Sequence, residues 1–422
     1  MNNYLPKNID LSTKEANING TSLLALAEKH GTPLYVYDWE HILDNLSHFR
    51  ESFGEDTLFR YAAKAFICKA FVKELQEQGW GTDVVSGGEM STVRESIGTL
   101  ETSLFNGTFK SREEMVYFIQ NKGGHISIDN RTEVEEVDRV SSELGTKQDV
   151  LIRLNLDLGA ETHPMVLTSG QKQQFGISPT HAEEVVENIY SLKNLNFKGV
   201  HVHIGSQIKD PQRYFMAMET CGSFLTRFVD KIDTEPIFNA GGGFFSPYAG
   251  DDYDEDLSTY SDAINTGINK SWGSDYRLMV EPGRAIVNNP GIILYTTGAI
   301  KSDRGEKPYV LVDGGMSDNP RPALYGSEHK LFNISNKSKQ KNTFAVSGRH
   351  CESGDLLVEN AELPSETKKG DVLMSTSTGA YTYSMASNYN RVPKSAVVAV
   401  RRNSSELVVN KQSFEDVSLN DV

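Results

Sequence analysis

One lysine of this 422-residue chain has a setting that suggests covalent chemistry. Lys64 lies in the segment YAAKAF, at the end of a strand-like apolar run. A lysine amine attacks an aldehyde only when it is neutral, and burial would lower its pKa toward that state. Taken alone, such a segment is more often a surface lysine at a strand end, so other residues must support a Schiff-base role.

A glycine run later in the chain suggests a phosphate-binding loop. Gly241, Gly242 and Gly243 follow one another in AGGGF, and such glycines let backbone N–H groups approach an anion closely. A flexible turn is the simpler explanation of the run. Arg284 in EPGRA and the hydroxyl of Ser206 in HIGSQ add two donors that favour the anion.

Glu281 and His203 lie in two of the same segments. A carboxylate at a strand end often only pairs with a cation, but beside a pyridine ring it keeps the ring nitrogen protonated. A protonated ring is the stronger electron sink for loss of CO₂ from an α-carbon. His203 could stack on such a ring, although an interior histidine with satisfied hydrogen bonds is common.

Two further segments carry groups suited to an amino acid. In RPALYG, Arg321 could bind a carboxylate with two parallel hydrogen bonds, and Tyr325 could donate to the same group. In CESGD, the Cys351 thiol could reprotonate a carbanion, and Glu352 could hold an ammonium group. An inert buried thiol is the alternative for Cys351, since that is the usual state of free cysteine.

The elements that must position these residues alternate between strand and helix over the first two thirds of the chain. Helical spacing of apolar residues is clearest at 68–79, 111–124, 131–145 and 179–192. Short runs of strand-forming residues occur at 58–64, 82–86, 103–107, 125–129, 149–155, 197–205, 236–243 and 277–283. Eight strands with intervening helices are typical of a parallel (β/α)₈ barrel, although an open sheet also alternates in this way.

After about Val287 the helical pattern fades, and β-forming runs are separated by Gly, Pro, Asp and Asn. This favours a mostly antiparallel β-sandwich or β-barrel domain. We therefore predict an α/β protein with a TIM (β/α)₈ barrel at 36–286 and a β domain formed by 1–35 and 287–422. The strand-like run at 32–38 precedes the barrel, and the N-terminal strand is expected to join the β domain.

Charge and composition exclude several classes of protein. The formal net charge of −15 argues against nucleic-acid and anionic membrane surfaces. The three cysteines suggest neither a disulfide framework nor a zinc site, and we predict no metal. No run approaches the ~20 apolar residues that span a bilayer, and the N-terminus lacks the pattern of a signal peptide. We expect a cytoplasmic enzyme.

Taken together, these segments resemble the fold-type III pyridoxal 5′-phosphate (PLP) decarboxylases, and within them the branch that acts on diaminopimelate. The resemblance covers about residues 32–400. The motifs that carry it occur in family order: YAAKAF, DVVSGGE, HIGSQI, GGGF, EPGR, RPALYG, CESGD, GAY and SNYN.

The resemblance implies a role for each residue. Lys64 would form the Schiff base with PLP, and Cys351 would be the general acid. The remaining cofactor contacts would be Asp83, His203, Ser206, Gly241, Gly242, Gly243, Glu281, Gly283, Arg284 and Tyr381. The substrate contacts would be Arg284, Arg321, Tyr325, Glu352 and Tyr381.

The implied reaction is decarboxylation of meso-2,6-diaminopimelate, at its D-configured centre, to L-lysine. Arg321 and Glu352 would hold the distal carboxylate and ammonium. The resemblance also implies a homodimer, in which Cys351 and Glu352 reach the barrel of the other subunit. Gln174 and Phe66 depart from the family, whose members often have lysine and asparagine there.

Three alternatives stay open. The same chemistry could act on carboxynorspermidine, ornithine or arginine. An amino-acid racemase would share the architecture but needs an acid/base tyrosine opposite the lysine. A non-catalytic relative would be expected to have lost cofactor or catalytic residues, yet Lys64, Glu281, Arg284 and Cys351 are all present.

Overall fold

The structure is a computed structural model. It describes residues 3–13, 15–156, 174–232, 234–251, 256–303 and 307–422. The chain divides into two compact units. The unit that we call the sheet unit comprises Met1–Asn45, Ser246–Asp254 and Arg284–Val422, and the barrel unit comprises Leu46–Phe245 and Glu255–Gly283.

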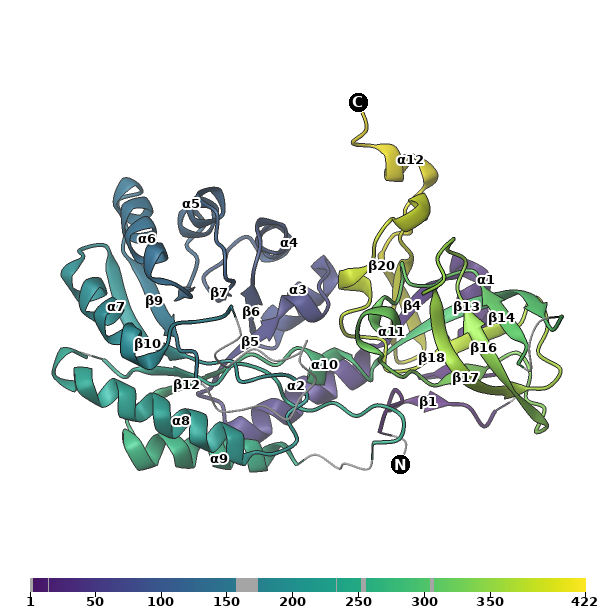
Figure 1. The fold of residues 1–422 in the computed structure, drawn as a ribbon, viewed down its shortest axis with the longest axis horizontal. Coiled ribbons are helices and arrows are strands. Elements are labelled where there is room, and N and C mark those ends of the chain that lie inside the picture. The colour runs from purple at the N-terminus through teal and green to yellow at the C-terminus, as the bar shows by residue number, and fades with distance from the viewer. Residues whose placement is uncertain (1–2, 14, 157–173, 233, 252–255, 304–306) are drawn as a thin grey trace. The chain divides into compact units, whose positions relative to one another are not determined.

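The barrel unit is a closed barrel of parallel strands in the order β10-β11-β12-β5-β6-β7-β8-β9 (Figure 1). The strands are β5 (Leu58–Ala62), β6 (Gly81–Val84), β7 (Ser103–Phe105), β8 (His125–Ile128), β9 (Gln148–Arg153), β10 (Leu195–His201), β11 (Ile237–Asn239) and β12 (Arg277–Val280). The predicted eight-stranded parallel barrel is confirmed.

Each strand begins within two residues of the predicted run but ends earlier. The run predicted at 236–243 contains β11, which stops at Asn239, and only Ala240 separates it from the glycine run. The following glycines turn the backbone away from the strand, with φ +69° at Gly241 and +102° at Gly243. The carboxyl ends of the strands therefore pass into loops built for close backbone approach.

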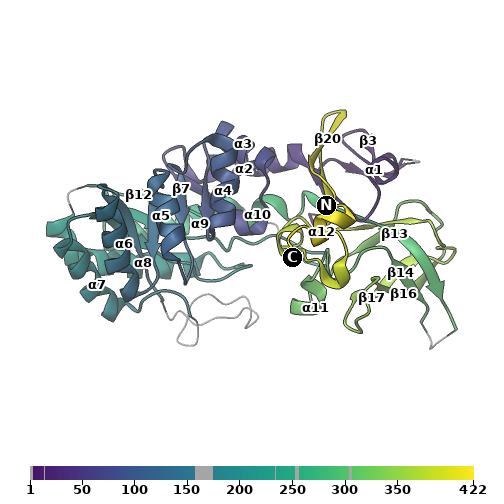
Figure 2. The same cartoon turned by 90° about the horizontal axis from the view of Figure 1, so that it is seen from above.

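Four barrel helices, α4, α5, α6 and α9, begin at a residue whose side chain caps the helix. Ser111 and Glu114 form a capping box at the start of α5, and Asn130 accepts two backbone N–H bonds at the start of α6. Figure 2 shows α4, α5 and α6 side by side. The helices are α3 (Lys69–Glu77), α4 (Gly87–Ile97), α5 (Arg112–Gln120), α6 (Arg131–Glu143), α7 (Pro179–Ser191), α8 (Gln212–Leu225) and α9 (Leu257–Ser271).

The sheet unit is built on a nine-stranded mixed sheet with the path β17-β16-β14-β13-β4-β19-β20, to which β15 and β18 add. β13 pairs antiparallel with β4, β14 and β18, while β4–β19 and β14–β16 are parallel pairs. The strands are β4 (Leu34–Asp38), β13 (Gly291–Lys301), β14 (Tyr309–Val312), β15 (Leu331–Asn333), β16 (Lys341–Ser347), β17 (Leu356–Pro364), β18 (Val372–Ser375), β19 (Ala396–Arg401) and β20 (Ser404–Val409). A mostly antiparallel β domain is confirmed.

Shorter elements complete the sheet unit. Val36, Leu294, Met374 and Val398 meet in its buried apolar core. The elements are β1 (Ile9–Asp10), β2 (Asn17–Ile18), β3 (Thr21–Ser22), α1 (Leu23–His30), α10 (Arg284–Val287), α11 (Arg321–Tyr325) and α12 (Phe414–Ser418), and α2 (Trp39–Phe53) runs from this unit into the barrel unit. Within the described ranges, no helix combines the length and apolarity needed to cross a membrane.

Candidate active site

Polar side chains lie at the carboxyl end of every barrel strand, which is the end where barrel enzymes place their chemistry. In strand order they are Lys64, Asp83, Asn106, Asp129, Arg153, His201, Asn239 and Glu281. All except Lys64 are at least nine-tenths buried. Buried polar groups are costly unless they are hydrogen-bonded, so this layer must be held by its own contacts or by a ligand.

Glu281 lies at the centre of this layer. Asn239 Nδ2 donates to its Oε1 at 2.6 Å, Asn106 Nδ2 at 3.2 Å, and His201 Nε2 lies 3.4 Å away. Burial acts to raise the pKa of Glu281, but His201, His203 and the bond from Asn239 outweigh it, and the pKa is lowered. Glu281 is therefore a buried carboxylate held in its ionised form.

Asp83 behaves in the opposite way. Its Oδ1 accepts from Asn106 Nδ2 at 2.7 Å, so Asn106 bridges the two carboxylates. Burial and the charge of Glu281 raise the pKa of Asp83 to about 7, against the opposing charge of Lys64. The two buried acids therefore differ in charge, which is a recurring arrangement at catalytic sites.

The glycine loop is joined to this network through Asn239. Asn239 Oδ1 accepts from the Gly241 N–H at 2.9 Å while its Nδ2 holds Glu281. A Cβ at Gly241, Gly242 or Gly243 would come within 2.3 Å of a backbone oxygen, so no side chain fits there. The loop is a bare backbone cradle of the kind that accepts a phosphate.

His203 contacts the same loop. Its Nδ1 accepts a hydrogen bond from the Gly242 N–H at 3.0 Å. Burial, followed by the charges of Lys64 and Arg153, lowers the pKa of His203 well below its usual value. Because Nδ1 accepts the bond from Gly242, the ring proton is on Nε2.

Lys64 lies on a 3₁₀ turn, Ala63–Ala65, directly after β5. Its charge acts on Asp83, Glu89 and His203, which places the amine among the strand-end groups. The side chain is exposed, so the expected burial of Lys64 is not observed. Gly283 supports this turn, since a Cβ there would come within 2.9 Å of the Ala62 side chain.

The sheet unit holds a second group of predicted residues. Arg284 and Arg321 are 7% and 5% exposed, and both guanidinium groups lie over the ring of Tyr381, at 4.8 and 5.5 Å from its centroid. Arg321 also lies 5.0 Å from the centroid of Tyr325. Two stacked cations beside each other form a strong site for an anion.

The CESGD loop joins β16 to β17. Asp355 is 1% exposed and accepts from the backbone N–H groups of His350 and Met316, at 2.8 and 2.6 Å. The Cys351 N–H donates to Asn390 at 3.1 Å. This bracing leaves the side chains of Cys351 and Glu352 exposed, and Cys351 is not an inert buried thiol.

Ser206, Phe66 and Gln174 were also discussed from the sequence, and their burial differs. Ser206 is partly buried in the loop after β10. Phe66 is fully buried and packs on Phe71 at 5.9 Å, so it is a core residue. Gln174 is exposed.

Five residues of the strand-end network, the arginine pair and the CESGD loop were not predicted from the sequence. They are Asn106, His201, Asn239, Tyr248 and Asp355. Asn239 and His201 each lie two residues before a residue that the sequence did single out, Gly241 and His203, so their position near these residues could have pointed to them. Tyr248 has no such signal. Its hydroxyl accepts from Arg284 Nη1 at 2.9 Å.

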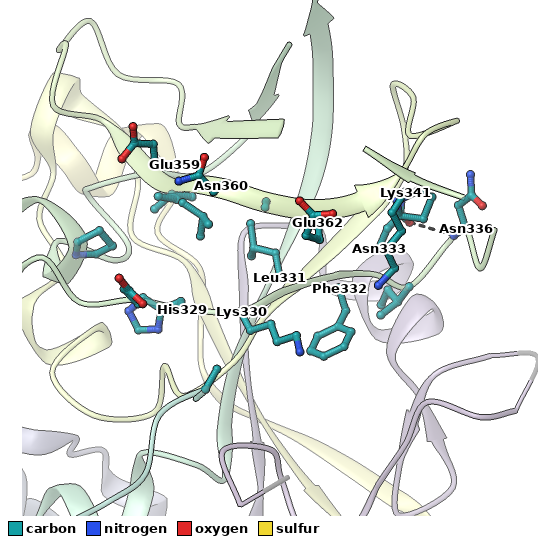
Figure 3. Close-up of a pocket in the computed structure, with 18 of the residues that line it drawn as sticks. His329, Lys330, Leu331, Phe332, Asn333, Asn336, Lys341, Glu359, Asn360 and Glu362 are labelled. Atoms are coloured by element: carbon teal, nitrogen blue, oxygen red, sulfur yellow. Dashed lines mark hydrogen bonds between the residues drawn. The ribbon is translucent and has the colours of Figure 1, made fainter. Parts of the chain in front are cut away.

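A cavity of about 1010 Å³ lies elsewhere in the sheet unit (Figure 3). Its walls come largely from β15, β17 and the segment after α11, with Lys330 over the ring of Phe332 at 5.4 Å. None of the predicted site residues lines it. Throughout the described ranges, no cluster of His, Cys, Asp and Glu could hold a metal ion.

Comparison with known proteins identifies the family. Residues 39–288 match the pyridoxal-binding domain of the pyridoxal-dependent decarboxylases. The chain is 37% identical to diaminopimelate decarboxylase of Bacillus subtilis over 95% of this chain and 93% of that protein. It is 35% identical to the Staphylococcus aureus enzyme, over 96% and 97%. The crystal structure of M. jannaschii diaminopimelate decarboxylase with L-lysine superposes with a TM-score of 0.92 at 30% identity, covering 100% of this chain and 99% of that one.

The matches run almost from end to end, and they include both the strand-end network and the CESGD loop. The chain therefore belongs to the pyridoxal-dependent decarboxylases, and within them to the diaminopimelate decarboxylase family.

Proposed function

We propose that this chain decarboxylates meso-2,6-diaminopimelate to L-lysine and CO₂, the last step of lysine biosynthesis. The substrate assignment is supported by the near-complete similarity to diaminopimelate decarboxylases. One structural observation carries the chemistry. Glu281 is a buried, ionised carboxylate that Asn239 ties to a glycine cradle. A carboxylate beside a phosphate cradle fits a cofactor with a pyridine nitrogen at one end and a phosphate at the other.

The residues present therefore fit PLP, the cofactor of this family. Bound PLP supplies an electron sink for the electron pair left when the carboxylate departs. We assign the phosphate to the glycine cradle with Ser206 and Arg284. Glu281 would face the ring nitrogen, where an ionised carboxylate would favour a protonated nitrogen. The remaining cofactor contacts would come from Asp83, His203, Gly283 and Tyr381.

The chain's own groups orient the substrate and move protons. Lys64 would supply the amine that holds the cofactor. Arg321 and Tyr325 bind the distal carboxylate, with Arg284 and Tyr381 nearby, and Glu352 holds the distal ammonium. The Cys351 Sγ–H donates a proton to the carbon that has lost CO₂. An exposed, braced loop suits this last role, because its thiol and carboxylate are free to meet a substrate.

The wider assignments are also proposals. We infer a homodimer in which Cys351 and Glu352 complete the site of the other subunit, because both side chains are exposed in a single chain. We infer a cytoplasmic location. We keep the domain limits at 36–286 for the barrel and at 1–35 with 287–422 for the β domain.

The proposed function is tested by measuring CO₂ and L-lysine released from meso-diaminopimelate, with and without added PLP. Ornithine, arginine and carboxynorspermidine are compared side by side. Borohydride reduction and peptide mapping should locate the cofactor on Lys64 and should find none in Lys64→Ala. Preference for another of these substrates would overturn the substrate assignment, and an adduct on another side chain would overturn the role of Lys64.

A further inference from the structure

Tyr248 contacts Arg284 and Arg321, with which it forms what we call the arginine cluster, and the proposed function gives it no role. It lies in the segment SPYAG, within the sheet unit that also contains Arg284 and Arg321. Arg284 Nη1 donates to the Tyr248 hydroxyl at 2.9 Å, and Arg321 also hydrogen-bonds to this hydroxyl. The two buried cations therefore share one phenol oxygen.

This sharing determines where the hydroxyl proton points. A guanidinium group has only donors, so both arginines use lone pairs of the oxygen and neither can accept its proton. Among the described residues, no acceptor is found for the Tyr248 O–H. The proton is thus left for a third partner, and an oxyanion is the partner that two adjacent cations favour.

Arg321 gives a second, independent indication of a missing anion. Its side chain is buried, and no carboxylate lies within 4.0 Å of it in the part of the chain that the structure describes. Its Nε is buried without a hydrogen-bond partner. A buried cation with an unused donor is costly, and an incoming oxyanion would satisfy the charge and the donor together.

His329 holds Tyr248 in this position without adding charge. Its ring meets the Tyr248 ring edge-on at 5.9 Å, and its Nδ1 lies 2.9 Å from the Thr376 carbonyl. Burial and the charges of Arg321 and Arg284 lower the pKa of His329 to about 4, so the ring is neutral near pH 7. The cluster therefore offers an anion two cations and one hydroxyl proton.

We propose that Tyr248 is the third donor of an oxyanion site formed with Arg284 and Arg321, and that its hydroxyl selects ligands with a carboxylate at the end distant from the reacting carbon. This inference rests on the proposed function and adds a specificity residue to it. The same oxyanion chemistry would also suit the cofactor phosphate, so the test separates the two.

The test compares Tyr248→Phe with wild type in two titrations. Binding of L-lysine and of cadaverine, which differ by one carboxylate, is measured by calorimetry on the PLP-loaded enzyme. PLP binding to the cofactor-free enzyme is measured by absorbance. We expect the dissociation constant for L-lysine to rise about 10- to 100-fold, as for the loss of one hydrogen bond to a charged group, while those for cadaverine and PLP stay within about twofold.

Tyr276→Phe is the matched control, because it removes a partly buried tyrosine hydroxyl that donates to Asn265 Oδ1 at 2.6 Å, outside the cluster. Unchanged lysine affinity in Tyr248→Phe would overturn the proposal, and so would a rise confined to PLP. If Tyr248→Phe unfolds at a lower temperature than the control, a second variant, Tyr248→His, is measured, because its ring N–H can replace the lost hydroxyl donor. Partial recovery of lysine affinity would then support the proposal, and none would overturn it. Wild-type CO₂ release is measured separately, so failure of the proposed function is recognised by itself.

Discussion

The pH dependence of stability tests the two-carboxylate network most directly. Asp83 is 2% exposed and its pKa is raised to about 7, first by burial and then by Glu281. In the unfolded chain an aspartate has a pKa of about 3.9. Between these values the folded protein keeps a proton that the unfolded chain has lost, so the contribution of Asp83 to stability falls as pH rises through this window.

The size of the effect follows from the same shift. Each unit of pKa difference corresponds to about 1.4 kcal/mol, and about two pH units of the window lie between pH 5 and the folded pKa. Asp83→Asn cannot ionise, and its amide oxygen can still accept from Asn106. We therefore expect wild type to lose about 3 kcal/mol more unfolding free energy than the variant when the pH is raised from 5 to 8.

The assay is urea unfolding of cofactor-free protein at several pH values, followed by tryptophan fluorescence, to which Trp80 contributes. Trp80 is 2% exposed and stacks on Phe59 in the barrel unit, so it reports on barrel unfolding. Asp230→Asn, at an exposed position, is the control and should run parallel to wild type. Parallel curves for Asp83→Asn and wild type would show that Asp83 does not hold the proton, and the reasoning about the pair would be wrong.

The remaining predictions concern single side chains. Arg321→Ala should raise KM for diaminopimelate by the equivalent of about 2–5 kcal/mol in steady-state assays, because it removes a charged partner of a buried carboxylate; an unchanged KM would contradict that role. Cys351→Ser should lower kcat by about 10²–10⁴-fold with little change in KM, and a kcat near wild type would assign the proton to another group. Asn239→Ala should cost about 1–3 kcal/mol of unfolding free energy and weaken PLP binding, measured by urea unfolding and absorbance titration. If only stability fell, Asn239 would not orient Glu281 for the cofactor.

Local patterns predicted most of the architecture. Strand-forming runs and helical spacing predicted the alternating strands and helices, because side-chain periodicity acts within a few residues, but an open sheet would alternate in the same way. Strand ends were predicted too long, since apolar content does not show where glycines such as Gly241 leave the ladder. The family motifs also pointed to Lys64 and Glu281, whose residue types match the chemistry of an aldehyde and a pyridine ring.

The sequence by itself determined which elements form and which residue types can do the chemistry. Only the tertiary structure decided which of them meet. Closing the barrel brings Asn239 to Glu281 and Asn106 to Asp83, and folding of the sheet unit brings Tyr248 to Arg321, 73 positions further along the chain. These contacts, and the charges that follow from them, depend on burial and on partners distant in sequence. No local pattern encodes such quantities, because they exist only once the chain has closed on itself.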